Sequence, residues 1–203
     1  MDSKRALKQL HAFRKHGKEM RLAAEAWKND YEILISTIMS ARTRDEITIS
    51  FAEKLFRKYS SPKKLANANI KDVQKIIKQI NFYKNKSKNI INCAKSLVSG
   101  HNGNVPHDFE KLIELPGVGR KTANVFLSEI GQDSIGVDTH VSYISQKVGW
   151  TKNKAPEKIE QDLKSLFSQN HWRHVNSTLV RFGKTHTSKR QKDELIKKIK
   201  NIK

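Results

Sequence analysis

The feature that most constrains this chain is a glycine-containing segment between two apolar helical patterns. Residues 115–124 read LPGVGRKTAN. Pro116 cannot extend a preceding helix, because it lacks an N–H group and its ring clashes with the turn before it. Gly117 and Gly119 permit positive φ angles and the close approach of another chain. Apolar residues then recur at helical spacing from Ala123 to Ile130, so the segment predicts a helix, a tight hairpin and a second helix.

The hairpin predicts a binding site for an anion. Backbone amides at a helix N-terminus point outward, and the helix dipole favours a negative group such as phosphate there. A phosphate-binding P-loop is an alternative interpretation of the glycines before Lys121-Thr122. That motif needs a glycine directly before the lysine and a strand before the loop. Here Arg120 holds the glycine position and no strand pattern precedes it, which disfavours the P-loop.

The charge of the chain indicates a polyanionic partner. The 203 residues include 40 Lys and Arg against 20 Asp and Glu, a formal net charge of +20. Binding to such a partner should depend strongly on salt. A basic ribosomal or chromatin-like protein without catalysis would share this charge. The longest apolar run, residues 33–39, is far too short to span a membrane, so we expect a soluble, intracellular protein without a membrane partner.

The hydrophobic pattern is helical along the whole chain, and no strand alternation occurs, which predicts an all-α protein. Expected helix starts include Asp30, Asp45 and Asn69 as capping residues. The expected helices are 1–27 with a break at Gly17, 31–39, 46–59, 62–66, a helix opened by Asn69, 84–99, 141–148, 156–167, 171–182 and 189–203.

Residues 115–124, together with the later Val137-Asp138-Thr139-His140, closely resemble the helix-hairpin-helix and following Asp loop of the endonuclease III family of DNA glycosylases. Weaker resemblance extends from about Tyr31 to Trp150, well over half of the chain. The resemblance implies two helical lobes. The first is a six-helix barrel-like lobe over 28–135 with the helix-hairpin-helix at about 108–131, and the second joins 1–27 to 136–203. DNA would lie against the cleft between them, where Lys121 and Asp138 would face each other.

The resemblance implies base excision repair of double-stranded DNA that contains damaged bases or abasic sites, with Lys121 and Asp138 as catalytic residues. A lysine at a helix N-terminus that lines a pocket is driven toward the neutral amine, which can attack a sugar C1′ and form a Schiff base. An ordinary phosphate-binding lysine is the alternative. Asp138 would stabilise positive charge on the sugar; its structural alternative is a helix N-cap, and the two roles are compatible.

The resemblance also implies DNA contacts beyond the catalytic pair. The residues concerned are Ser40, Arg42, Phe82, Pro116, Gly117, Val118, Gly119, Arg120 and His140. Arg42 and Phe82 correspond to residues that fill the gap left by an extruded base, although Arg42 replaces the glutamine usual in the family. Phe82 has an alternative role as a core aromatic that anchors its loop. His140 either contacts or orients DNA, or makes a structural hydrogen bond.

Metal and cofactor expectations depart from the family pattern. Cys93 is the only cysteine, whereas endonuclease III usually carries four near its C-terminus, and Thr187 stands where the first is expected. Clusters of this kind need several cysteine thiolates, so we expect no iron–sulfur cluster, no other cofactor and no metal at His171 and His174. Similar hairpins hold a monovalent cation on backbone carbonyls, here those of Ile113, Leu115 and Val118.

Three functions remain open from the sequence. The first is a bifunctional glycosylase and abasic-site lyase that acts on damaged, notably oxidised, pyrimidines. The second is a mismatch-specific uracil or thymine glycosylase, although such relatives usually lack the lysine at position 121. The third is a non-enzymatic helix-hairpin-helix DNA-binding protein. We expect a monomer, cytoplasmic and nucleoid-associated if the source is prokaryotic.

Overall fold

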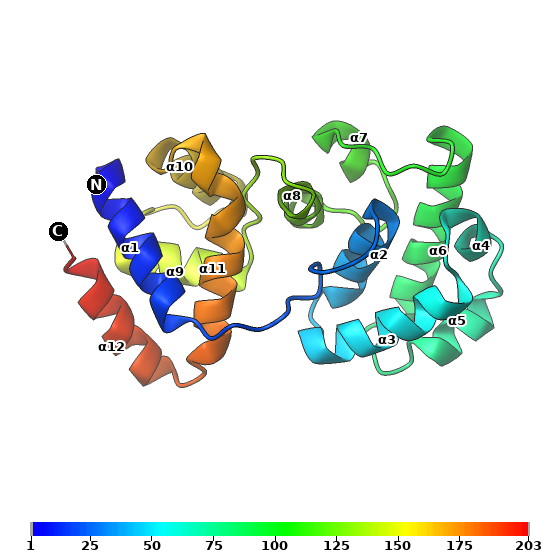
Figure 1. Cartoon of the computed structure of the whole chain (residues 1–203), viewed down its shortest axis with the longest axis horizontal. Helices are drawn as coiled ribbons and strands as arrows, with labels where there is room; N and C mark the ends of the chain where they lie inside the picture. Colours follow the sequence, from blue (N-terminus) through cyan, green and yellow to red (C-terminus); the bar gives the residue numbers. More distant parts are fainter. Residues whose placement is uncertain (1, 203) are drawn as a thin grey trace. The chain divides into compact units, whose positions relative to one another are not determined.

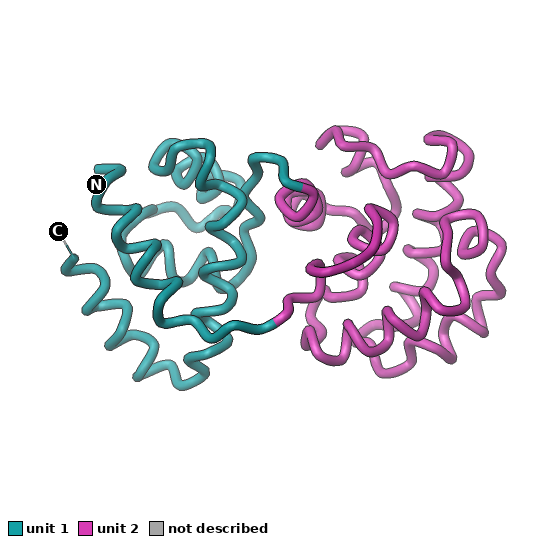
Figure 2. The backbone as a smooth tube through the Cα atoms, in the orientation of Figure 1, with its two compact units in different colours: residues 1–20, 131–203 teal, residues 21–130 magenta. Residues whose placement is uncertain are grey.

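The computed structural model describes residues 2–202, and along this range every regular element is a helix (Figure 1). The prediction of an all-α protein is therefore confirmed. The chain folds into two compact units, which Figure 2 distinguishes by colour. Unit 1 joins residues 1–20 to 131–203, and unit 2 comprises residues 21–130. The sequence had placed the corresponding boundaries at 28 and 135.

Unit 2 is built around a buried helix. Its helices are α2 (Asp30–Ser40), α3 (Asp45–Lys58), α4 (Pro62–Ala66), α5 (Ile70–Ile76), α6 (Tyr83–Gly100), α7 (Phe109–Ile113) and α8 (Arg120–Glu129). Residues 31–39 of α2 are buried without exception, as expected for a strongly apolar helix. α3, α6 and α8 pack against α2. This arrangement fixes the end of α2 and the start of α8, where the candidate site residues of this unit lie.

Unit 1 combines the two ends of the chain. Its helices are α1 (Ser3–His16), α9 (Thr139–Val148), α10 (Pro156–Leu166), α11 (Trp172–Thr185) and α12 (Lys189–Lys200), with a short 3-10 turn at Gln169–His171. Phe13 of α1 lies at the centre of the core, with its ring edge-on to Phe182 at 4.8 Å and to Trp150 at 5.6 Å. α1 packs against both α11 and α12 (Figure 1).

Several helix ends differ from the prediction. The expected break at Gly17 is present, but residues 18–27, which were expected to continue the helix, are not helical. Helix α1 stops at His16 because Gly17 turns the backbone to an extended conformation and then passes close to α11. A Cβ atom on Gly17 would lie 3.1 Å from the backbone nitrogen of Phe182. Asn29 caps α2 in place of Asp30, and Arg44 precedes α3 in place of Asp45. In both cases the acidic residue becomes the first residue of the helix, where the dipole favours negative charge.

The C-terminal helix α12 is held by side chains from α1 and α9. Arg5 donates hydrogen bonds to the carbonyls of Lys200 (2.7 Å) and Ile202 (2.8 Å), and Gln9 donates to the Lys200 carbonyl (3.1 Å). Lys147 of α9 pairs with Asp193 at 3.1 Å. The last carbonyls of a helix lack hydrogen-bond donors within the helix. Here Arg5 and Gln9 of α1 supply the donor groups. Along residues 2–202, no helix combines the length and apolar character needed to span a bilayer.

Candidate nucleic-acid interface and active site

The predicted helix-hairpin-helix is present in unit 2. Leu115 donates its amide to the Leu112 carbonyl at 3.1 Å, and Val118 donates to the Leu115 carbonyl at 3.0 Å. Gly117 lies between them with φ +83°, a conformation that glycine adopts readily. Leu115 and Val118 point into the core. The hairpin is therefore a tight turn anchored by two apolar side chains.

Two further contacts fix the hairpin against its surroundings. A Cβ atom on Gly117 would lie 2.8 Å from Cβ of Asn89, so the turn lies directly on α6. The Arg120 guanidinium lies 4.9 Å from the centre of the Phe109 ring, which joins the start of α8 to α7. Gly117 therefore serves the fold of the hairpin itself, in addition to any contact with a ligand.

Gly119 differs from Gly117 in both conformation and surroundings. It is the N-cap of α8, with φ −97° and no side chain to accept from the first amides of the helix. A Cβ atom on Gly119 would meet nothing within 4 Å. The first amides of a helix lack intrahelical partners and suit a phosphate oxygen. The open space at Gly119 leaves room for a phosphate to approach the start of α8.

We expect Gly119→Ala to weaken binding to damaged and undamaged DNA alike by about 10-fold, the loss of roughly one hydrogen bond to a charged group. The fold should survive, since the new methyl group enters open space at an ordinary φ. Fluorescence anisotropy over a salt titration measures the effect. Gly100→Ala is the matched control, because that site is also open within 4 Å. Equal affinities for the two variants would contradict the phosphate assignment. Gly117→Ala is a poorer probe, because it would strain the turn.

Lys121 is the second residue of α8, and its side chain is exposed. Pro116 is half-buried on the hairpin, and Arg120 is exposed at the first turn. The hairpin thus presents basic side chains and helix amides at one helix terminus. Among the carbonyls predicted to hold a cation, that of Leu115 already accepts from the Val118 amide. The cation site, with Ile113 and Val118 as its other members, stays a prediction.

Asp138 lies in unit 1, where it is the N-cap of α9. Its Oδ1 accepts a hydrogen bond from the Val141 amide at 2.8 Å. The loop before it is fixed to α11, because Asn176 donates its side-chain amide to the Gly136 carbonyl at 2.7 Å. Asp138 therefore has the structural role of a helix N-cap, and its side chain is half-buried. Lys121 lies in unit 2 and Asp138 lies in unit 1. The expectation that they face each other therefore stays a prediction.

His140 packs on a glycine in the last turn of a helix. A Cβ atom on Gly183 of α11 would lie 2.2 Å from Nδ1 of His140. Glycine inside a helix is unfavourable by roughly 0.5–1 kcal/mol relative to alanine, and here it makes room for the imidazole ring. The resulting contact orients His140 relative to the backbone of α11. Gly183 was not singled out from the sequence, because it lies directly after the predicted end of the helix at residue 182, whereas α11 continues to Thr185.

Arg42 and Phe82 come together although 40 positions separate them in the sequence. The Arg42 guanidinium lies 5.2 Å from the centre of the Phe82 ring. Both residues have left-handed backbones, with φ +56° and +59°. Phe82 is 57% exposed, so it is not a core aromatic. Ser40, which ends α2 nearby in sequence, donates its hydroxyl to the Thr37 carbonyl at 2.8 Å.

A buried lysine contacts the residues on either side of Arg42, and it was not predicted from the sequence. Lys86 of α6 is only 6% exposed. Its Nζ donates to the carbonyls of Met39 (2.7 Å) and Ala41 (2.5 Å) and to Oγ1 of Thr43 (3.2 Å). Burial lowers the pKa of the Lys86 ammonium to about 8, while the three accepting oxygens favour its charged form. The available signal was its helical spacing, four residues before Ile90 of the core face.

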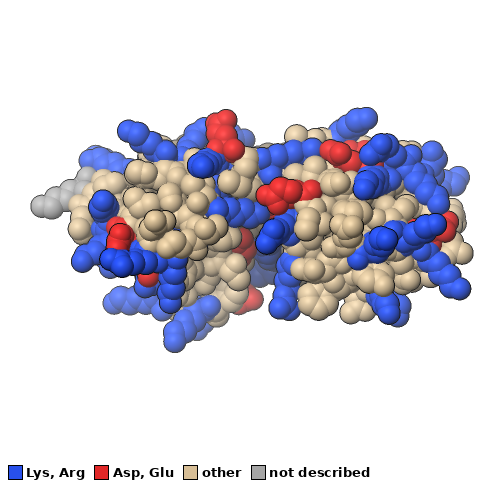
Figure 3. All heavy atoms as spheres, turned by 90° about the horizontal axis from the view of Figure 1, so that it is seen from below, with Lys and Arg blue, Asp and Glu red and all other residues tan. Residues whose placement is uncertain are grey.

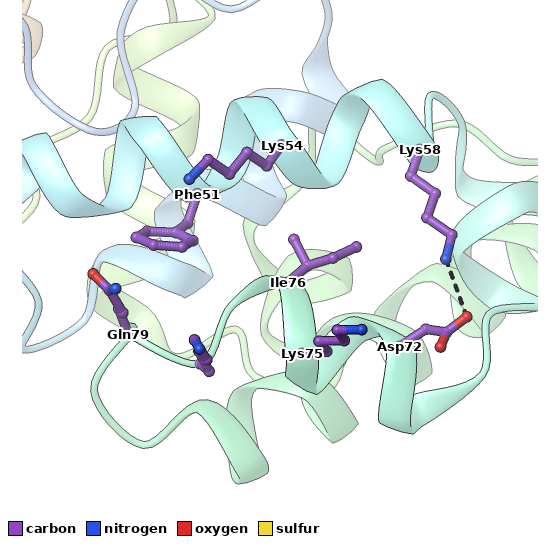
Figure 4. Close-up of a pocket in the computed structure, with 8 residues that line it drawn as sticks. Phe51, Lys54, Lys58, Asp72, Lys75, Ile76 and Gln79 are labelled. Atoms are coloured by element: carbon purple, nitrogen blue, oxygen red, sulfur yellow. Dashed lines mark hydrogen bonds and ion pairs between the residues drawn. The ribbon is translucent and has the colours of Figure 1, made fainter.

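An open pocket of about 520 Å³ lies between α3 and α5 in unit 2 (Figure 4). Its lining residues are Phe51, Lys54, Lys58, Asp72, Lys75, Ile76, Lys78 and Gln79. Lys58 pairs with Asp72 at 3.0 Å, and the Lys54 ammonium lies 4.4 Å from the centre of the Phe51 ring. Lysine and arginine side chains are also abundant on the face of each unit seen in Figure 3. The pocket lysines therefore belong to a generally basic surface.

The donor set of the chain does not fit an iron–sulfur cluster. Such clusters are held by several cysteine thiolates, and Cys93 is the only cysteine. It lies fully buried in the core of unit 2, where burial raises the pKa of its thiol to about 12. Within residues 2–202, no three His, Cys, Asp or Glu side chains are grouped so as to hold a metal ion.

Comparison with known proteins gives consistent matches. Residues 35–169 match the HhH-GPD superfamily of base excision DNA repair proteins. Endonuclease III of Thermotoga maritima is 41% identical over 155 residues, 76% of this chain and 73% of that protein. Endonuclease III of Rickettsia conorii is 38% identical over 169 residues, 82% of this chain and 80% of that protein. A solved trapped endonuclease III–DNA covalent intermediate superposes with a TM-score of 0.84 at 29% identity, covering 93% of this chain and 89% of that one.

Proposed function

The chain belongs to the endonuclease III family within the HhH-GPD superfamily of base excision DNA repair proteins, and from this premise we propose which damage it repairs and how. It is a DNA glycosylase and abasic-site lyase that binds DNA. We propose that its substrates are oxidised or ring-saturated pyrimidines in double-stranded DNA. The observation that carries the lyase chemistry is Lys121, which is exposed at the second position of α8 directly after the hairpin.

In the proposed reaction the Lys121 amine attacks C1′ of the deoxyribose. The bond from C1′ to the base breaks, and the base leaves with a proton. Opening of the sugar ring then gives an imine between Nζ and C1′. Removal of a proton from C2′ expels the 3′ phosphate, which is the β-elimination step, and hydrolysis of the imine frees the lysine.

Asp138 has an electrostatic role in this reaction. As the base departs, positive charge develops on the sugar, and a carboxylate stabilises that charge when little water screens it. Its Oδ1 is fixed by the hydrogen bond from the Val141 amide, so the group does not need to reorganise during the reaction. A fixed charge of this kind lowers the barrier without becoming covalently involved.

A glycosylase must also extract the target base from the stack. Phe82 and Arg42 are the candidates to fill the gap, because Phe82 is exposed and the Arg42 guanidinium lies against its ring. The loss of stacking on extrusion amounts to a few kcal/mol, and insertion of an aromatic ring and a guanidinium plane offsets part of it.

The substrate proposal is tested with duplexes that each carry one lesion: thymine glycol, uracil, mismatched thymine, 8-oxoguanine or an abasic site. We expect release of thymine glycol and strand cleavage at the abasic site. Excision confined to uracil or mismatched thymine, without strand cleavage, would favour a mismatch-specific glycosylase. Tight binding without cleavage of any duplex would favour a DNA-binding protein that lacks catalysis.

We propose that the protein acts as a monomer. We also propose that it acts without an iron–sulfur cluster, on the ground that it has one cysteine. Purified protein is expected to be colourless, to contain no stoichiometric iron, and to keep its excision activity after treatment with an iron chelator. Absorbance near 400 nm that rises with bound iron would contradict this. In a prokaryote, the DNA substrate would place the protein at the nucleoid in the cytoplasm.

A further inference from the structure

The loops that carry Arg42 and Phe82 are joined by hydrogen bonds. The Asn81 side-chain amide donates to the Arg42 carbonyl, and the Asn81 backbone amide donates to Thr43 Oγ1 at 3.1 Å. The loop after α2 therefore has its position set by the loop before α6. Thr43 is central to this contact, because the same oxygen also accepts from Lys86 at 3.2 Å.

Both loops hold an unfavourable backbone conformation. Arg42 and Phe82 each have a positive φ although neither is glycine. Such conformations are unfavourable for residues with a side chain and persist only where the surrounding structure fixes them. Without the contacts around Asn81 and Lys86, the two loops should relax to more common conformations. The guanidinium and the ring would then separate.

Lys86 is the group that fixes the base of this arrangement. Its ammonium lies at the C-terminal end of α2, where Met39 is the penultimate residue and Ala41 is the C-cap. Carbonyls at this end lack helical partners and carry partial negative charge. All three oxygens that accept from Nζ are neutral. A buried ammonium without a carboxylate partner is poorly stabilised, so an apolar side chain would serve packing at least as well.

We propose that Lys86 is a positioning residue for base extrusion, which holds the Arg42 and Phe82 loops so that the two side chains enter the DNA stack together. This inference rests on the proposed function. Lys86 itself is buried and does not touch DNA. Lys86 restricts the two loops before binding, and this reduces the conformational entropy that is lost when Arg42 and Phe82 enter the duplex.

The decisive experiment is a double-mutant cycle between Lys86→Met and Phe82→Ala. Methionine keeps an unbranched stem and removes the ammonium. Each single variant should lower excision of thymine glycol from a duplex by roughly 10- to 100-fold, the range expected when reacting groups are misplaced by about 1 Å. If Lys86 acts through Phe82, the double variant should lose little more than either single variant. Multiplied losses would show that the two residues act independently and would overturn the proposal.

A second measurement separates positioning from general destabilisation. Lyase action on an abasic site in single-stranded DNA needs little unstacking, so Lys86→Met should stay within about twofold of the wild type there. An equal loss on duplex and single strand would also overturn the proposal. Lys88→Met is the matched control, since Lys88 is exposed on the same helix. It should behave as the wild type on both substrates.

Thr43→Val provides an independent variant if Lys86→Met folds poorly. It keeps the shape of the side chain and removes the oxygen that accepts from both Lys86 and Asn81. We expect the same selective loss on duplex DNA. Fluorescence of 2-aminopurine opposite a tetrahydrofuran analogue of an abasic site, which has no C1′ hydroxyl and cannot form the imine, reports filling of the stack without chemistry. The loop effect therefore remains measurable if the wild type excises no base. A wild-type 2-aminopurine response in both Lys86→Met and Thr43→Val would refute the positioning role.

Discussion

Lys121→Gln is expected to abolish both strand cleavage at abasic sites and the covalent protein–DNA complex that borohydride traps. Glutamine keeps a similar stem and lacks the amine that forms the imine. A protein–DNA covalent intermediate has been trapped for the endonuclease III structure to which this chain is similar. Trapping therefore provides a direct test in this protein, with denaturing gel electrophoresis as the measurement.

DNA binding should change little in Lys121→Gln. One of 40 basic residues is lost, and removal of one phosphate contact lowers the slope of log affinity against log salt by about 1 at most. The expected result is thus a variant that binds damaged duplex and does not cross-link to it. A large loss of binding would instead indicate that Lys121 is mainly a phosphate-binding lysine.

Lys71→Gln is the control for the position within a helix as well as for the charge. Lys71 is the second residue of α5 and is exposed, as Lys121 is the second residue of α8. It should trap and cleave DNA as the wild type does. A normal yield of trapped complex in Lys121→Gln would place the nucleophile elsewhere, on another lysine or on the N-terminal amine, and would remove the central residue of the proposed mechanism.

Local features of the fold could be predicted from the sequence because neighbouring residues determine them. The hairpin depends on Pro116, Gly117 and Gly119, and it lies where the sequence placed it. Asn69 caps its helix as expected, because a cap needs only a side-chain oxygen and the amide of a residue two or three positions ahead. The prediction that Asp30 caps α2 was wrong, and Asn29 is the cap. Both side chains carry an oxygen that can accept such a hydrogen bond, so the sequence does not distinguish the two adjacent residues.

Long-range features could not be predicted, because they depend on which helices meet. The break at Gly17 was predicted, but its close passage beside α11, more than 150 positions further along the chain, was not. The role of Lys86 depends on the loop around Thr43 being placed next to α6. The contact between His140 and Gly183 likewise requires α9 to pack on α11. A lysine or a glycine in a helical pattern gives no sign of such partners.

Asp138→Asn should reduce the rate of base excision by roughly 100- to 1,000-fold, the usual effect of losing one well-placed electrostatic stabiliser. The protein should remain folded, because asparagine also caps helices and its side-chain oxygen can accept from the Val141 amide as Asp138 does. Loss of the negative charge at the N-terminus of α9 should lower the free energy of unfolding by about 0.3–1 kcal/mol. Single-turnover excision and thermal unfolding measure the two quantities.

Asp2→Asn separates catalysis from capping within the same unit. Asp2 is the N-cap of α1 and accepts from the Arg5 amide at 2.9 Å, so its substitution removes an equivalent charge at an equivalent position. Its effect on stability should be similar, and its effect on excision should be absent. Equal rates for the two variants would reduce Asp138 to a capping residue. A slow rate confined to Asp138→Asn, with the borohydride-trapped complex still forming at that slower rate, would separate the electrostatic role of the carboxylate from the covalent role of Lys121.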